Sequence, residues 1–132
     1  MRHEVSDAHT AMAVGSGDLP VLATPWLIAW MEAATVRAAA PFTAPGRTTV
    51  GTGVRVKHLR ATRVGAWVDV LAEPPTEADG RQLTFLVRAL DSTGELVATG
   101  EIDRAIVDRR RFLARASAQD SGFNRGARGG HP

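Results

Sequence analysis

The sequence of 132 residues contains no cysteine. Without a thiol, a chain cannot form a disulfide, use a thiolate as nucleophile or bind a metal through cysteine, so these three kinds of site are excluded. Long apolar runs are also absent, because no segment approaches the roughly 18 apolar residues of a membrane-spanning helix. Residues 1–6 lack the apolar region of a signal peptide. We therefore expect a cytoplasmic protein, and we expect no metal and no cofactor.

Positive charge is concentrated at the C-terminal end. Residues 1–108 hold 10 Lys and Arg against 13 Asp and Glu, whereas residues 109–132 hold 6 against 1. The chain is long enough for one domain and too short for two. Because the Gly- and Arg-rich end has no sustained apolar period, we predict a domain of residues 1–116 and a disordered basic tail of residues 117–132. A solvated tail explains this composition more simply than an RNA-binding arm, so we expect no nucleic-acid partner.

Residues 22–42 are almost wholly apolar or small and carry the end signals of a helix. Thr24 fits the N-cap position, and Pro25 fits the first helical position, where a missing N–H costs nothing. Pro41 cannot continue a helix, so the pattern predicts an element of about 16 residues. A helix that is apolar nearly all round is usually buried, which makes this segment the central helix of the predicted fold.

One carboxylate, Glu32, stands in the middle of this apolar stretch. The other charged residue there, Arg37, is five positions away, and at about 100° per residue the two side chains lie roughly 140° apart instead of pairing. Burying an unpaired carboxylate is costly. Glu32 must therefore reach a polar partner inside the protein or line a cleft.

After the helix, the sequence changes from a helical period to the alternation of strands. Residues 48–59 alternate, and the pattern places an inward row at Val50, Thr52, Val54, Val56 and His58. Further strands are predicted at residues 66–73, 82–90 and 96–107, and a short strand is predicted before the helix at residues 10–14.

Short connections make neighbouring strands antiparallel. The sequence therefore predicts an α+β protein in which an antiparallel sheet wraps around one long central helix, which is the hotdog fold. So small a sheet cannot cover the helix on every side. We therefore expect a homodimer, which would bury the remaining apolar surface.

Three polar side chains of this predicted fold point toward one region: Thr24 at the helix start, Glu32 two turns later and His58 at the end of the first long strand. A carboxylate can attack a thioester carbonyl or activate water, an imidazole can carry protons near neutral pH, and a hydroxyl can orient either group. Each residue also has a purely structural interpretation. Thr24 can serve only as a helix cap, and His58 can be a hydrogen-bonded residue at the edge of the core.

Residues 23–25, 30–38 (WMEAATVRA), 40–42 and 51–58 (GTGVRVKH) resemble the fluoroacetyl-CoA thioesterase family of hotdog proteins, with similarity over about residues 21–107. In that family a Thr, a Glu and a His form the catalytic set, and Thr24, Glu32 and His58 match its types and spacing. The resemblance implies an acyl-CoA thioesterase with Glu32 as nucleophile or general base, His58 as proton carrier and Thr24 as orienting hydroxyl. Fluoroacetyl specificity does not follow from the resemblance, because the Gly-rich residues 14–20 stand where the family's fluoroacetate-specific members have an aromatic, apolar lid.

The resemblance also points to residues that would bind substrate. Gly51 matches a glycine that the family places beside the acyl group, although a glycine there also fits a strand bulge. Lys57, Arg60 and Arg63 lie close to His58 and either bind the phosphates of coenzyme A or form a solvated edge. The alternative function is a non-catalytic acyl-CoA or small-ligand binding protein on the same fold. The remaining histidines have no metal-ligand spacing.

Overall fold

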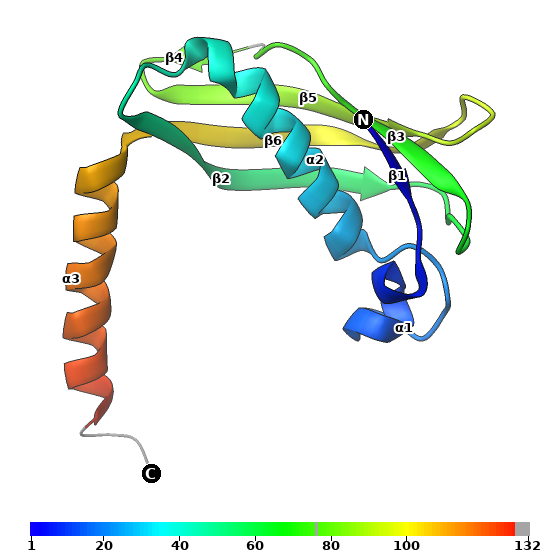
Figure 1. The fold of residues 1–132 in the computed structure, drawn as a ribbon, viewed down its shortest axis with the longest axis horizontal. Coiled ribbons are helices and arrows are strands. Elements are labelled where there is room, and N and C mark those ends of the chain that lie inside the picture. Colours follow the sequence, from blue (N-terminus) through cyan, green and yellow to red (C-terminus); the bar gives the residue numbers. More distant parts are fainter. Residues whose placement is uncertain (76, 129–132) are drawn as a thin grey trace.

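A curved antiparallel sheet forms one layer of the protein, and a long helix forms the other (Figure 1). The computed structural model describes residues 1–75 and 77–128, and its described strands follow the order β1-β3-β5-β6-β2, with β4 paired only to β5. The strands are β1 (Arg2–Glu4), β2 (Arg47–His58), β3 (Trp67–Ala72), β4 (Glu77–Asp79), β5 (Gln82–Leu90) and β6 (Leu96–Asp108). The helices are α1 (Ala11–Val14), α2 (Thr24–Ala39) and α3 (Arg109–Arg128), with 3-10 turns η1 (Asp7–His9) and η2 (Ala40–Phe42).

Helix α2 lies across one face of the sheet (Figure 1). Its buried residues recur every three or four positions, as one buried helix face requires, and they are Leu27, Trp30, Met31, Thr35 and Ala39. They face a sheet core that includes Val68, Val70, Phe85, Val87 and Ile102. The described residues leave the opposite side of α2 largely uncovered, and Val36 there is 50% exposed. The helix therefore carries an apolar surface that this one chain does not bury.

The predicted length of α2 is confirmed, since the helix has 16 residues, but its predicted cap is wrong. Ala23 occupies the N-cap position, and Thr24 is the first helical residue. No side-chain hydrogen bond caps the helix, because alanine has no polar side chain, and the Thr24 hydroxyl bonds to His58 instead. The hydroxyl of Thr24 is therefore committed to a contact between α2 and β2.

Strand β2 contains a bulge that the alternation pattern did not predict. Gly51 pairs with Arg104 and Gly53 pairs with Asp103, so Thr52 is an extra residue between two consecutive partners. The bulge reverses which residues face inward. Gly51 faces α2, so Val50 and Thr52 do not belong to the predicted inward row, whereas Val54, Val56 and His58 beyond the bulge keep their inward face.

The N-terminal segment also differs from its prediction. Residues 11–14, predicted as a strand, form the short helix α1, and the Thr10 hydroxyl caps this helix by accepting a hydrogen bond from the N–H of Ala13 at 3.2 Å. The strand before α2 is instead β1, which pairs antiparallel with β3. A side-chain cap thus overrides the weak alternation of residues 10–14.

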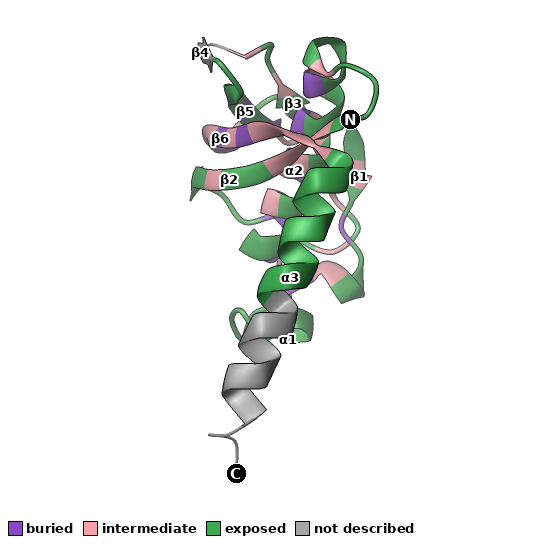
Figure 2. Cartoon of the chain, turned by 90° about the vertical axis from the view of Figure 1, so that its left-hand side faces the viewer, coloured by how far each residue is buried: buried purple, intermediate pink, exposed green. Residues whose placement is uncertain are grey.

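Helix α3 leaves the end of β6 and extends away from the sheet (Figure 1). The N–H of Arg111 donates to the carboxylate of Asp108 at 3.0 Å, which caps the first turn. Its side chains are exposed as far as the structure describes them (Figure 2). The disorder predicted for residues 117–132 stays a prediction, and residues 129–132 lie outside the described part of the chain. None of the described helices is long and apolar enough to span a membrane.

Candidate active site

Thr24 and His58 meet at the end of the sheet where α2 begins. The hydroxyl oxygen of Thr24 lies 2.8 Å from Nδ1 of His58, within hydrogen-bond distance. His58 is the last residue of β2 and is held there by its pairing with Ala98 of β6. The first turn of α2 and the last residue of β2 thus fix a hydroxyl and an imidazole against each other.

The imidazole of His58 is half-buried and borders a pocket of about 290 Å³. The pocket is lined by Ala11, Ser16, Val21, Leu22, Thr24, His58, Leu59, Arg60 and Ala61. Burial lowers the pKa of His58 below its ordinary value, so the ring is neutral at pH 7. Its Nε2 atom is buried and has no well-formed hydrogen bond among the described residues, although an interaction of the ring with the Arg60 backbone partly opposes the fall in pKa. A neutral imidazole with one uncommitted nitrogen can accept or donate a proton.

Glu32 lies in a second cluster, between α2 and the bulge of β2. Its Oε2 is 3.9 Å from Nη1 of Arg104, and the Arg104 side chain is only 7% exposed. Arg104 is itself fixed, because it donates to the side chain and the carbonyl of Thr49 at 2.9 and 3.1 Å. Burial lowers the pKa of Arg104, and the carboxylate of Glu32 opposes this shift. Of the two alternatives predicted for Glu32, a polar partner or a cleft, the structure shows a polar partner, the buried Arg104, while the Glu32 side chain itself is 40% exposed.

The lack of a side chain at Gly51 leaves space for the Glu32 carboxylate. A Cβ atom at Gly51 would lie 2.8 Å from Oε2 of Glu32 and 3.6 Å from Nη1 of Arg104. Such a contact is too close, so the carboxylate could not keep this position beside any larger residue. The bulge interpretation of Gly51 is confirmed. Its predicted place beside the acyl group stays a prediction.

The structure does not bring the three predicted catalytic residues together in one chain. Thr24 and Glu32 are eight residues apart on α2, which is about 12 Å along the helix axis. Among the described residues, no hydrogen bond or ion pair joins Glu32 to Thr24 or His58. One chain therefore carries a Thr–His pair and a separate Glu–Arg pair, and the catalytic roles stay predictions.

The three basic residues predicted to bind phosphate occupy different surroundings. Arg60 lines the Thr24–His58 pocket and lies 3.8 Å from the exposed carboxylate of Glu95. Lys57 borders a separate hollow of about 450 Å³ on β2 and β6. Arg63 is exposed, and its guanidinium reaches the carbonyl of Val64 at 3.5 Å. Only Arg60 is placed to meet a ligand in the pocket of His58.

Arg104 is the site residue that the sequence reasoning missed. It follows Ala98, Gly100 and Ile102 on the inward row of β6, and it is buried. A charged residue on an otherwise small or apolar row is a recognisable signal, because burying a guanidinium requires a partner. Among the described residues, no group of three His, Asp or Glu side chains could hold a metal.

Gly51→Ala is expected to lower turnover by about 10- to 100-fold, because the new methyl group displaces the Glu32 carboxylate and small misplacements of a reacting group have effects of this size. The displaced atom is the end of a flexible side chain, so the fold should survive. Steady-state kinetics and thermal melting of the purified variant provide the measurement. Gly53→Ala is the comparison in the same strand, since its methyl group would meet Asp103 instead, and the oligomeric state of both variants is measured because Asp103 binds Arg55. Equal losses in both variants would contradict a specific role for Gly51.

Known proteins share this fold and sequence. The chain matches the family model of fluoroacetyl-CoA-specific thioesterases over residues 5–110. A fluoroacetyl-CoA thioesterase of Streptantibioticus cattleyicolor is 38% identical over 95 residues, which cover 72% of this chain and 67% of that protein. A crystal structure of a mutant fluoroacetyl-CoA-specific thioesterase in complex with fluoroacetate and CoA superposes with a TM-score of 0.80 at 30% identity, covering 90% of this chain and 96% of that one.

A hypothetical protein of Thermus thermophilus, a thioesterase superfamily member, has a TM-score of 0.85 at 24% identity, covering 94% of this chain and 90% of that one. At this identity the likeness shows the fold alone. The sequence matches above go further, because they cover most of the chain. The chain therefore belongs to the fluoroacetyl-CoA-specific thioesterase family, has the hotdog fold and is a thioester hydrolase.

Proposed function

We propose that this protein hydrolyses a small acyl-CoA thioester at a site made of Thr24, His58 and Glu32, with the glutamate supplied by a second copy of the chain. The observation that carries the proposal is the 2.8 Å contact between Thr24 and His58 beside a pocket. The family relationship supports the acyl-CoA substrate. A cytoplasmic location is part of the same proposal.

The chemistry divides between the two clusters. The Glu32 carboxylate either attacks the thioester carbonyl or removes a proton from the attacking water. The C–S bond then breaks, and His58 carries the proton lost by the water to the leaving thiolate of coenzyme A, so the imidazole ends neutral again. If Glu32 itself attacks, the same water then hydrolyses the anhydride that it forms. Thr24 holds the imidazole in one orientation through its hydroxyl. The sum is one water consumed and one carboxylic acid and one thiol released.

A second chain is needed because the two clusters are separate within one chain. Strand β2 is the edge of the sheet and pairs only with β6, so one side of its 12-residue backbone is free among the described strands. A long free edge is a template for another strand. Val54 on this strand and Val36 on α2 are 40% and 50% exposed, which adds apolar surface next to the edge. Pairing of β2 with the β2 strand of a second copy would use both features.

One register of such a β2 pair would join the two clusters. An antiparallel β2 pair with its two-fold axis at Arg55 sets inward-facing residues opposite inward-facing residues along the ladder. His58 then lies opposite the bulge at Gly51 and Thr52 of the partner subunit. Because the Glu32 carboxylate occupies the space where a side chain at Gly51 would lie, this register would bring the partner subunit's Glu32 toward His58.

Arg55 itself is compatible with a position on the two-fold axis. Its guanidinium forms two hydrogen bonds to the carboxylate of Asp103 at 2.8 and 3.0 Å and lies 3.4 Å from Glu101. These acids raise the pKa of Arg55 and offset its charge within its own chain. Two copies of this cluster can therefore approach each other without strong repulsion between the arginines.

The test of the activity is the release of free thiol from a panel of short acyl-CoAs. We expect at least one acyl-CoA to be hydrolysed with saturation kinetics, and we do not expect fluoroacetyl-CoA to be preferred. The Gly-rich residues 14–20 include Ser16 at the pocket wall and provide no aromatic lid. Binding of the acyl-CoAs without any thiol release would instead support a non-catalytic binding protein.

A further inference from the structure

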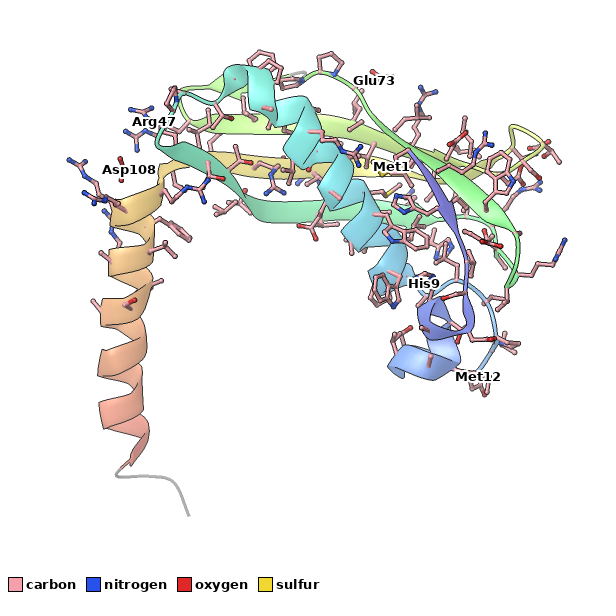
Figure 3. All side chains as sticks on the ribbon, in the orientation of Figure 1. Met1, His9, Met12, Arg47, Glu73 and Asp108 are labelled. Carbon is pink, nitrogen blue, oxygen red and sulfur yellow. The ribbon has the colours of Figure 1, made fainter. Side chains whose placement is uncertain are left out.

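A second small pocket lies at the far end of the sheet, where β6 passes into α3. Its volume is about 100 Å³, and it is lined by Arg81, Val107, Asp108, Arg111, Phe112 and Arg115. We call it the arginine pocket. Figure 3 places Arg47 and Asp108 at this corner, and these two residues are paired in the β2–β6 ladder. The corner is remote in sequence and space from the Thr24–His58 pocket of the same chain.

The arginine pocket has an excess of positive charge. Its lining includes three arginines and one acid, Asp108, whose carboxylate accepts a hydrogen bond from the backbone N–H of Arg111. Within the described part of the chain, Arg81, Arg111 and Arg115 form no salt bridge, whereas other arginines such as Arg55 do. Uncompensated guanidinium groups that converge on one hollow attract an anion, because little internal charge competes for them.

The chemistry of the lining favours phosphate. Guanidinium groups bind phosphate oxygens through pairs of N–H donors, which makes arginine the preferred residue for this anion. The hollow is too small for an extended apolar ligand, and Phe112, which is 42% exposed, offers one aromatic face beside the arginines. A nucleotide phosphate next to its base fits this combination of charges and aromatic surface.

We propose that the arginine pocket binds the phosphates at the nucleotide end of coenzyme A while the thioester lies at His58 of the partner subunit. This inference rests on the proposed function and its dimer. Within one chain, Arg47 and His58 are the two ends of β2, which separates the arginine pocket from the same chain's His58 by roughly 35 Å. A single ligand would have to run the whole length of the strand.

The two-fold axis at Arg55 removes this separation. In that register the start of β2 in one chain lies beside the residues that follow His58 in the other. Arg47, which marks the corner of the arginine pocket, would then lie opposite Arg63 of the partner subunit, three residues beyond Arg60 at the mouth of the partner subunit's pocket. Arg60 of one chain and Arg111 and Arg115 of the other would form a continuous basic rim around one ligand.

The first test compares two charge-matched double variants of the full-length protein. Arg111→Gln with Arg115→Gln removes two charges that line the pocket, and Arg109→Gln with Arg110→Gln removes two charges from the same exposed helix outside its lining. We expect the Kd for coenzyme A, measured by calorimetry, to rise about tenfold or more in the first variant and less than threefold in the second. Binding of pantetheine, which has no phosphate, should be unchanged in both.

Equal Kd values for coenzyme A in the two double variants would overturn the proposal. The proposal would also be overturned if Arg111→Gln/Arg115→Gln lost affinity for single-stranded RNA but kept its affinity for coenzyme A. If the wild-type protein binds coenzyme A but releases no thiol from any acyl-CoA, the proposed function fails, and the calorimetric comparison still tests the arginine pocket.

A mixed dimer shows which chain supplies the arginines. The Arg111→Gln/Arg115→Gln protein is mixed with a large excess of His58→Ala protein. Nearly every chain of the double variant then pairs with a His58→Ala chain. The intact His58 then faces unmodified arginines across the interface, so the KM for acyl-CoA should return to the wild-type value. A KM that stays raised would assign the arginines to the same chain as His58 and would contradict the proposal.

Discussion

Glu32→Gln is expected to lower kcat/KM for the best acyl-CoA by on the order of 10²-fold or more, which is typical when a positioned acid or base is lost. Glutamine keeps the shape of the side chain and can still meet Arg104, but it can neither attack a carbonyl nor remove a proton. The carboxylate lies 3.9 Å from the buried guanidinium of Arg104, and its side chain is 40% exposed, so it can also meet a ligand from outside the chain. Steady-state thiol release measures the effect.

Glu73→Gln is the matched control for this substitution. It removes one carboxylate that lies 3.5 Å from an arginine, Arg88, on an exposed part of the sheet. Its turnover should equal that of the wild type, and both variants should show the same circular dichroism spectrum. Wild-type turnover in Glu32→Gln would remove Glu32 from the mechanism.

His58→Ala is expected to lower kcat/KM by a similar factor and to change the dependence of kcat/KM on pH. Burial lowers the pKa of His58, so the wild-type enzyme should lose activity as the pH falls, with a midpoint below the ordinary value of about 6.5. Above that midpoint the imidazole is neutral and can take part in proton transfer. The acid limb assigned to His58 should be absent from the residual activity of His58→Ala.

The same shift has a consequence for stability. The folded protein resists protonation of His58 while the unfolded chain accepts the proton at its ordinary pKa, so this residue lowers the free energy of unfolding as the pH drops through about 6.5 and below. His58→Asn can keep a hydrogen bond to Thr24 but cannot titrate. The free energy of unfolding of both proteins is measured between pH 5 and pH 8. If it fell with pH in His58→Asn as steeply as in the wild type, the pH dependence would belong to another group.

Local signals in the sequence were enough to predict the helix and most of the sheet. Pro25 and Pro41 set the ends of α2, and the alternation of residues 82–90 matches β5 (Gln82–Leu90). The family resemblance and the hotdog fold are confirmed by relatives and solved structures. These features depend on backbone chemistry and on periodic burial, which are written in short stretches of sequence.

The features that were missed depend on contacts between distant segments. The bulge at Thr52 is set by the pairing of β2 with β6, and a shift of one residue changes the inward face without changing the composition. Thr24 has the residue type of a cap, but a histidine 34 positions later takes its hydroxyl. Arg104 becomes a partner of Glu32 only when β6 passes beneath α2. No window of sequence around these residues contains that information.

The central claim is that each active site takes its glutamate from one chain and its threonine and histidine from the other. The most direct measurement is the activity of a mixed dimer of Glu32→Gln and His58→Ala chains, purified through two different affinity tags. One of its two sites would contain an intact Glu32 and an intact His58, so the mixed dimer should regain about half of the wild-type turnover, although each variant alone is nearly inactive. A mixed dimer no more active than the two parent variants would contradict a site shared between chains.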